Sequence, residues 1–149
     1  MEFVIPRPLK LEHDELHEQL RKATRESGGL GEAAKEVAKL MHPHFVKEEE
    51  YALPPLGLLP LLAKGTVTPD MAAVLPMTDK LKAELGHMLA EHKSIVAALR
   101  NLADAAKRAN KPEYAEFADK LILHAQTEED VSYPTAILIG EHLKLKLGK

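Results

Sequence analysis

Apolar residues recur every three or four positions along most of this chain, which is the spacing of one face of an α-helix. The strict alternation of apolar and polar residues that is typical of β-strands is nearly absent. The pattern therefore predicts an all-α fold. Four long helices are expected, followed by a short C-terminal helix, at about 8–28, 32–52, 78–109, 112–132 and within 134–149.

Prolines and glycines set the expected helix ends. Gly28 stops the first helix, and Pro112 lies at the start of the fourth. The fourth helix is expected to end near Ser132, because the residue before Pro134 is pushed out of helical geometry. The proline-rich segment 53–70 cannot form one regular helix, so it is expected to fold over one end of the other helices.

The chain contains an internal repeat. Residues 44–55 read HFVKEEEYALPP and residues 124–135 read HAQTEEDVSYPT. Each stretch has a histidine, a glutamate pair that begins four residues later and a proline ten residues after the histidine. A Glu-His pair precedes each stretch, at 12–13 and at 91–92. The two Glu-His pairs are therefore nearly as far apart in the chain as the two stretches are.

Each half of the repeat, about 8–64 and 78–149, therefore consists of a helix with one histidine followed by a helix with His-x-x-x-Glu. We expect each half to fold as a helical hairpin. Two hairpins related by a pseudo-twofold axis predict a single domain, 1–149, with the fold of an up-down-up-down four-helix bundle.

Histidines and glutamates interrupt the apolar face of every long helix. The third helix shows this best, because its stripe reads Leu81, Leu85, Met88, His92, Ile95, Leu99, Leu102. The stripes of the other helices contain His13, His44, Glu48, His124 and Glu128. A buried carboxylate is costly unless it is paired. Salt bridges with protonated histidines are one solution, and a cation that neutralises all six groups at once is the other.

The His-x-x-x-Glu spacing suits a site for two metal ions. Its two side chains leave one helix face about 6 Å apart along the axis, so the histidine binds one ion while the carboxylate reaches inward to bridge two. The chain has no cysteine. Imidazole and carboxylate without sulfur suit iron, manganese or zinc, and a carboxylate-bridged pair of ions favours iron. Open positions on such ions would bind dioxygen, nitric oxide or peroxide.

The composition of the chain excludes two kinds of binding partner, nucleic acid and anionic membranes. The net charge of -3 arises from 20 basic and 23 acidic residues that are mixed along the chain, which provides no field for binding nucleic acid or an anionic membrane. No apolar segment has the length of a signal sequence or a bilayer span. The expected protein is soluble and cytoplasmic, with a small-molecule ligand as its partner, and the sequence indicates no particular oligomeric state.

The motifs resemble those of the hemerythrin-like family, whose HHE cation-binding domains carry a histidine on each first helix and His-x-x-x-Glu on each second helix. The resemblance covers nearly the whole chain. It implies a bundle with a di-iron centre in which the two glutamates bridge the ions beside an oxo or hydroxo group. The iron ligands implied are His13, His44, Glu48, His92, His124 and Glu128.

The chain departs from the oxygen-carrying hemerythrins at its third helix, where those proteins have two histidines four residues apart. Here Met88 and Val96 take the positions four residues before and after His92. A pair four residues apart occurs instead on the first helix, as His13 and His17. We therefore predict His17 as an additional ligand, on the other ion. This difference argues against reversible oxygen transport but not against a metal site.

The fourth helix departs as well, because His-x-x-x-x-Asp in those proteins is replaced by His124 with Glu128 four and Glu129 five residues later. Glu128 is the expected ligand, and Glu129 would replace it if the helix bulged. Otherwise Glu129, like Glu49, is expected on the solvated surface. Tyr51 lies on the helical stripe, where it could hydrogen-bond a ligand held at the metal or simply pack in the core.

The expected function is that of a non-heme di-iron protein that binds dioxygen, nitric oxide or peroxide for sensing, storage or detoxification. Two alternatives stay open at this point. The first is an enzyme, a di-iron peroxidase or oxidase that turns over. The second is a regulatory bundle that binds zinc or a single ion.

Overall fold

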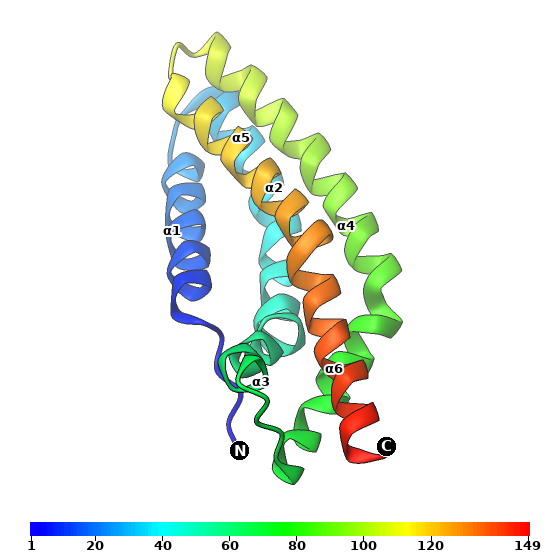
Figure 1. The fold of residues 1–149 in the computed structure, drawn as a ribbon. Coiled ribbons are helices and arrows are strands. Elements are labelled where there is room, and N and C mark those ends of the chain that lie inside the picture. The colour runs from blue at the N-terminus through cyan, green and yellow to red at the C-terminus, as the bar shows by residue number, and fades with distance from the viewer.

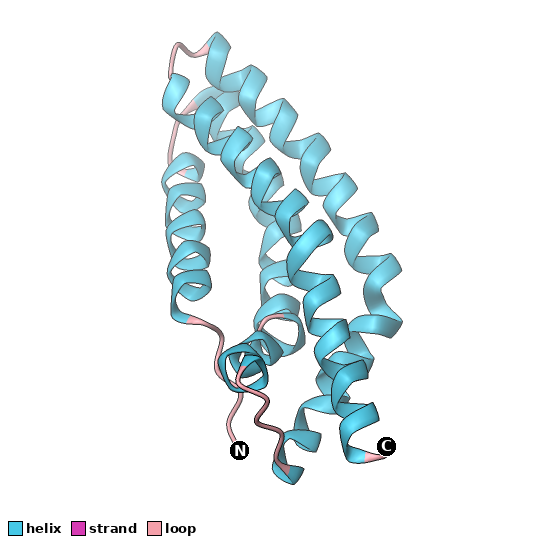
Figure 2. Ribbon diagram, viewed as in Figure 1, coloured by secondary structure: helices cyan, strands magenta, loops and turns pink.

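A computed structural model describes all residues, 1–149, and contains four long helices and no strand (Figures 1 and 2). The predicted all-α bundle is therefore confirmed. The α1–α2 and α4–α5 connections lie at one end of the bundle and both chain termini at the other, so the helices run alternately up and down (Figure 1). Their bounds are α1 Arg7–Thr24, α2 Gly28–Lys47, α4 Leu75–Arg108 and α5 Pro112–Thr127.

Residues with left-handed backbone conformations make both tight connections. Gly28, with φ of 68°, turns the chain into α2 where a side chain would be strained. Asn110, with φ of 57°, precedes Pro112, which begins α5 in the first turn where a missing N–H is tolerated. These short connections make α1 and α2, and likewise α4 and α5, antiparallel neighbours.

The fourth helix does not end at Ser132 as predicted. The chain continues through a π-helical turn, η4 (Glu128–Ser132), directly into α6 (Tyr133–Leu147). Tyr133 keeps helical angles, φ of -66° and ψ of -48°, and its N–H bonds the carbonyl of Glu128. The wide turn shifts the hydrogen-bond pattern by one residue, and Pro134 then lies in the first turn of α6. This position tolerates the proline without breaking the helix.

The same π-helical turn occurs in the other half of the repeat. It is η1 (Glu48–Ala52), where the N–H of Leu53 bonds the carbonyl of Glu48 at 2.8 Å. In both halves the glutamate of His-x-x-x-Glu is thus the first residue of the turn. The repeat therefore extends from the sequence to the backbone, at turns of a kind that often mark functional sites.

The proline-rich segment folds over the end of the bundle that holds the termini, as expected (Figure 1). It forms two 3-10 helices and one short α-helix, η2 (Pro54–Leu58), α3 (Leu59–Ala63) and η3 (Pro69–Val74). Its buried side chains, including Leu56 and Met71, pack with α6 residues such as Ile139 in one apolar cluster. No helix of the chain combines the length and the hydrophobicity that crossing a lipid bilayer requires.

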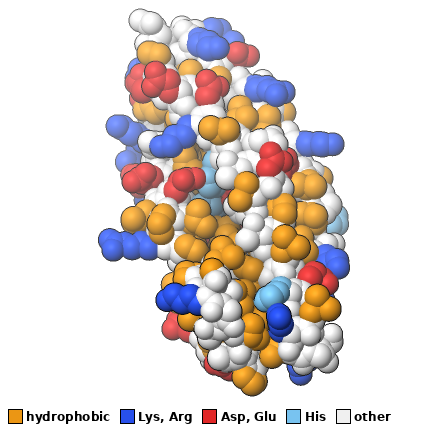
Figure 3. Space-filling view, in the orientation of Figure 1, with side chains coloured by type: hydrophobic (Ala, Val, Ile, Leu, Met, Phe, Trp, Pro, Cys, Tyr) orange, Lys and Arg blue, Asp and Glu red, His pale blue; other side chains and the backbone are white.

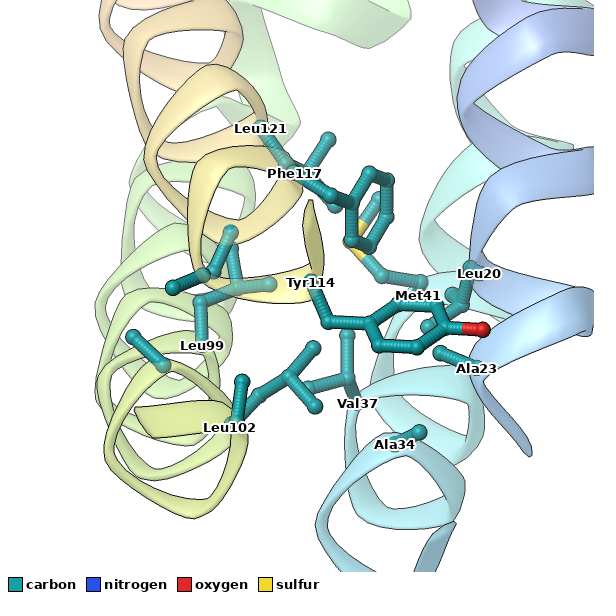
Figure 4. Close-up of a cluster of buried hydrophobic side chains, with 14 of the residues drawn as sticks. Leu20, Ala23, Ala34, Val37, Met41, Leu99, Leu102, Tyr114, Phe117 and Leu121 are labelled. Atoms are coloured by element: carbon teal, nitrogen blue, oxygen red, sulfur yellow. The ribbon is translucent and has the colours of Figure 1, made fainter. Parts of the chain in front are cut away.

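Two apolar clusters fill the interior. The first lies among α1, α2, α4 and α5 and includes Leu99 and Phe117 (Figure 4). The second lies toward the termini and includes Met88 and Tyr133. Each fully buried leucine in these clusters contributes about 2 kcal/mol of transfer free energy. On α4, His92 lies between the two clusters, so a polar layer separates two apolar ones.

Candidate metal centre

Six polar side chains form this layer, and they come from six different places in the chain. One histidine comes from each of α1, α2, α4 and α5, and each π-helical turn contributes its first residue. All six are almost completely shielded from water, since the side chain with the largest exposed fraction, that of His124, is 9% exposed. The six are His13, His44, Glu48, His92, His124 and Glu128.

Glu128 contacts histidines on both sides of the layer. Its Oε2 lies 3.4 Å from His13 Nε2 and 3.2 Å from His124 Nε2. Its Oε1 lies 3.3 Å from His92 Nε2. One carboxylate therefore faces two groups of imidazoles, as a bridging ligand must.

Glu48 takes the corresponding position from the other half of the repeat. Its Oε1 lies 3.7 Å from His13 Nε2 and its Oε2 lies 3.6 Å from His44 Nε2. The donor atoms form two groups, each within a 4.8 Å span: one of His44, Glu48, His92 and Glu128, the other of His13, His124 and Glu128. Each group joins a histidine of one hairpin to a histidine of the other.

Three of the four outward histidine nitrogens have a carboxylate as hydrogen-bond partner. His44 Nδ1 lies 3.2 Å from Glu91 Oε1, and His124 Nδ1 contacts Glu12 in the same manner. When Nδ1–H donates to a carboxylate, the lone pair of Nε2 is left facing inward, which is the tautomer that binds a metal. Sequence reasoning missed these roles, although Glu12 and Glu91 stand next to His13 and His92 in the repeat.

One of the other two histidines has the same arrangement, because His92 Nδ1 lies 3.2 Å from Glu129 Oε1. His13 Nδ1 lies 3.6 Å from Glu49 Oε2, which is too far for a hydrogen bond, and it has no hydrogen-bond partner. Glu49 and Glu129 were expected on the solvated surface, and about a third of each side chain is exposed. The expectation was incomplete, because the π-helical turn directs the carboxylate after each buried glutamate toward a histidine on a neighbouring helix.

The pKa values of two members of the cluster are raised. Burial disfavours a charged imidazole at His124, but the nearby Glu128 carboxylate outweighs burial and raises the pKa of His124 to about 9. Burial, together with the charge of Glu128, raises the pKa of Glu48 to about 7. Protons thus hold the cluster near neutrality when no cation is bound.

The protein's own hydrogen bonds do not satisfy the cluster. Glu48 Oε1 and His124 Nε2 are buried and have no hydrogen-bond partner. Such orphaned atoms are rare and costly in a folded protein. A cation between the inward nitrogens and the carboxylates would satisfy both, and the donors are of the kinds that iron, manganese and zinc bind. The residues present therefore fit a metal site.

A tyrosine that the sequence reasoning did not single out also enters the cluster. Tyr133 Oη lies 3.2 Å from His44 Nε2, 3.1 Å from His92 Nε2 and donates to Glu48 Oε2 at 2.5 Å. It was missed because the fourth helix was expected to end just before it. Tyr51 instead donates to Met88 Sδ at 3.7 Å in the second apolar cluster, where it packs as a core residue.

His17, predicted as an additional ligand, lies outside both donor groups. Its Nε2 is 3.3 Å from a guanidinium nitrogen of Arg21, and its ring faces His42 across 6.4 Å between centroids. The ring of Phe45 packs against both His13 and His17, at 4.7 and 6.1 Å. The structure thus brings the other six predicted residues together but not His17, because one turn of α1 carries it past the layer and onto a partly exposed surface.

A small cavity opens beside one of the two donor groups. It measures about 70 Å³ and lies between α1 and the end of α5, with His13, His124 and Glu128 in its wall. Leu9 and Leu53 supply apolar atoms to the same wall. Figure 3 shows histidine atoms at the floor of a hollow near the middle of this face. The cavity has room for a small molecule, since one water needs about 10–15 Å³ on such a measure.

Three buried imidazoles, a fourth that is 9% exposed and two buried carboxylates in a helical bundle define a metal-binding four-helix protein. The sequence model of one family, described as the hemerythrin HHE cation binding domain, matches residues 5–136. The chain therefore belongs to this family of cation-binding proteins. Comparison with curated proteins found no match, and comparison with solved structures found none.

Proposed function

We propose that this protein holds a pair of iron ions in its polar layer and binds dioxygen, nitric oxide or peroxide there, for sensing, storage or detoxification. One observation supports two ions more than any other. Glu128 belongs to both donor groups, with its two oxygens facing histidines on opposite sides. A single ion would leave one pair of these imidazoles and part of the carboxylate without a partner.

We infer the ligands of each ion from the two donor groups. His44 and His92 would hold one ion and His13 and His124 the other, with Glu48 and Glu128 as the bridging carboxylates. Ferrous iron, when bound there, would supply the affinity for dioxygen, nitric oxide or peroxide. The carboxylates on the Nδ1 atoms of His44, His92 and His124 would turn these rings so that Nε2 faces the ions.

The cavity between α1 and α5 supports entry of a ligand at the His13 and His124 side. Its wall holds His13, His124 and Glu128 together with the apolar side chains of Leu9 and Leu53. A cavity that borders these two imidazoles gives a small molecule a route to the ion that they would hold.

Metal content measured on protein purified anaerobically under reducing conditions tests the proposal. Two iron ions per chain are expected, with near-ultraviolet absorption after oxidation and a spectral change that saturates as nitric oxide is added. One ion per chain, or zinc without such absorption, would contradict it. Sustained consumption of peroxide over many turnovers would favour the peroxidase instead of the binding protein.

A further inference from the structure

We propose that the phenol oxygen of Tyr133 is a ligand of the ion held by His44 and His92, so that the two ions of the site are chemically unequal. This inference rests on the proposed pair of iron ions. One ion would have a tyrosine ligand that the other lacks. The ion held by His13 and His124, beside the cavity, would then be the one that binds the small molecule.

Two of the three distances around Tyr133 Oη match those between neighbouring ligands of one ion. Bonds of about 2.1 Å to an octahedral ion place adjacent ligand atoms about 3 Å apart. The phenol oxygen lies 3.2 Å from His44 Nε2 and 3.1 Å from His92 Nε2. The third neighbour, Glu48 Oε2, is 2.5 Å away. All three neighbours belong to residues of the same donor group.

The phenol oxygen is enclosed by atoms that can bind a metal. His44 Nδ1 and His92 Nδ1 each lie 3.2 Å from a carboxylate oxygen, of Glu91 and of Glu129, so these rings turn Nε2 toward Tyr133. Both Nε2 atoms and Glu48 Oε2 therefore converge on one hydroxyl oxygen, and Tyr133 is fully buried. A cation placed among the four atoms would bind all of them, and the phenol proton would be released when the ion binds.

The internal repeat shows that the tyrosine is present on one side only. Leu53 follows His44 by the same nine residues that separate Tyr133 from His124, and each is followed by a proline. Leu53 is buried and lines the cavity next to His13 and His124. Thus the repeat places an oxygen donor against one ion and a hydrocarbon side chain beside the other. The pseudo-twofold symmetry of the ligands is broken at this one pair of positions.

The test compares Tyr133→Phe with Tyr51→Phe, a matched change at another buried tyrosine that contacts only Met88 through its hydroxyl group. Each protein receives ferrous iron under anaerobic conditions and is then oxidised with ferricyanide. A phenolate bound to ferric iron gives a visible charge-transfer band. We expect the band in wild type and in Tyr51→Phe and its loss in Tyr133→Phe, with bound iron still measurable. An unchanged band in Tyr133→Phe would overturn the assignment.

Resonance Raman spectra of the wild-type ferric protein decide the question even if Tyr133→Phe does not fold. Excitation in the visible band should enhance the ring modes of a phenolate, and ring-deuterated tyrosine should shift them. Absence of these modes from a protein that contains two iron ions would refute the role of Tyr133 and leave the iron site intact. Failure of the wild-type chain to bind two iron ions would refute the proposed function itself.

Discussion

Glu91 on α4 holds the outer nitrogen of His44 on α2, with 3.2 Å between Oε1 and Nδ1, although the two residues are 47 positions apart. The other oxygen of Glu91 is 3.0 Å from Lys47 Nζ, which fixes the carboxylate between two groups of α2. The contact ties helices of different hairpins together and orients the imidazole that faces the metal centre. The repeat produces the equivalent contact between Glu12 and His124.

Loss of this outer carboxylate should weaken metal binding. In Glu91→Ala we expect metal affinity to fall by about 10–100-fold, the usual effect of removing a carboxylate that orients a metal-binding histidine. Competition with a chelator measures the metal affinity of each variant. Lys47→Ala is the matched control, because it removes the same ion pair and leaves the His44 contact in place. Equal affinity in Glu91→Ala and in the control would show that the contact does not support the site.

Loss of an inward imidazole should lower metal content and metal-dependent stability together. In His44→Ala and in His124→Ala we expect less bound iron and a smaller rise of the melting temperature on adding iron, because binding free energy contributes to folding in such sites. Thermal unfolding with and without a chelator measures the difference. His142→Ala, on an exposed position of α6, should behave as wild type. Unchanged iron in both variants would exclude these residues as ligands.

Stability of the metal-free protein should fall as the pH rises. The pKa of His124 is raised from 6.5 to about 9, so its stabilising contribution is complete below pH 6.5 and is lost as the pH rises through 9. The pKa of Glu48 is raised from 4.5 to about 7, so its contribution is lost as the pH rises through 7. Metal binding needs these groups without protons and should strengthen over the same range.

Adding metal should therefore raise the melting temperature more at a pH of about 9, the pKa of His124 in the folded protein, than at pH 6.5, the ordinary pKa of histidine. Thermal unfolding in the presence of chelator or of metal at both pH values measures this. Glu48→Gln serves as the control, because its neutral amide should flatten the metal-free profile between 4.5 and 7. A metal effect that shrinks as the pH rises would contradict the linkage.

Obstruction of the cavity should slow ligand binding without emptying the site. Thr127 is an exposed residue at the cavity wall, and Thr127→Phe places a ring over the opening. We expect the rate of nitric oxide binding to the ferrous protein to fall several-fold in stopped-flow measurements, with unchanged iron content. Leu123→Phe, one turn earlier on α5 at a side chain that is 66% exposed, should bind at the wild-type rate. Equal rates in all three proteins would place the entry route elsewhere.

The fold followed from the sequence because the signals for it are local. Helical periodicity, the turns at Gly28 and Pro112 and the repeat predicted the four long helices and their alternation. The error at Ser132 has a local cause as well. The rule for a residue before proline assumes regular α-helical hydrogen bonding, and the π-helical turn after Glu128 changes that pattern.

The spacing of residues along the helices predicted which side chains interrupt the apolar faces, because residues three and four positions apart share one face. That pattern led to the six residues of the polar layer. Their pairing, with His44 beside His92 and His13 beside His124, is set by the packing of the folded chain. The same packing turned Tyr133 into the layer and left His17 outside. These outcomes depend on helix rotation, π-helical turns and contacts between helices distant in the chain, which no local spacing encodes.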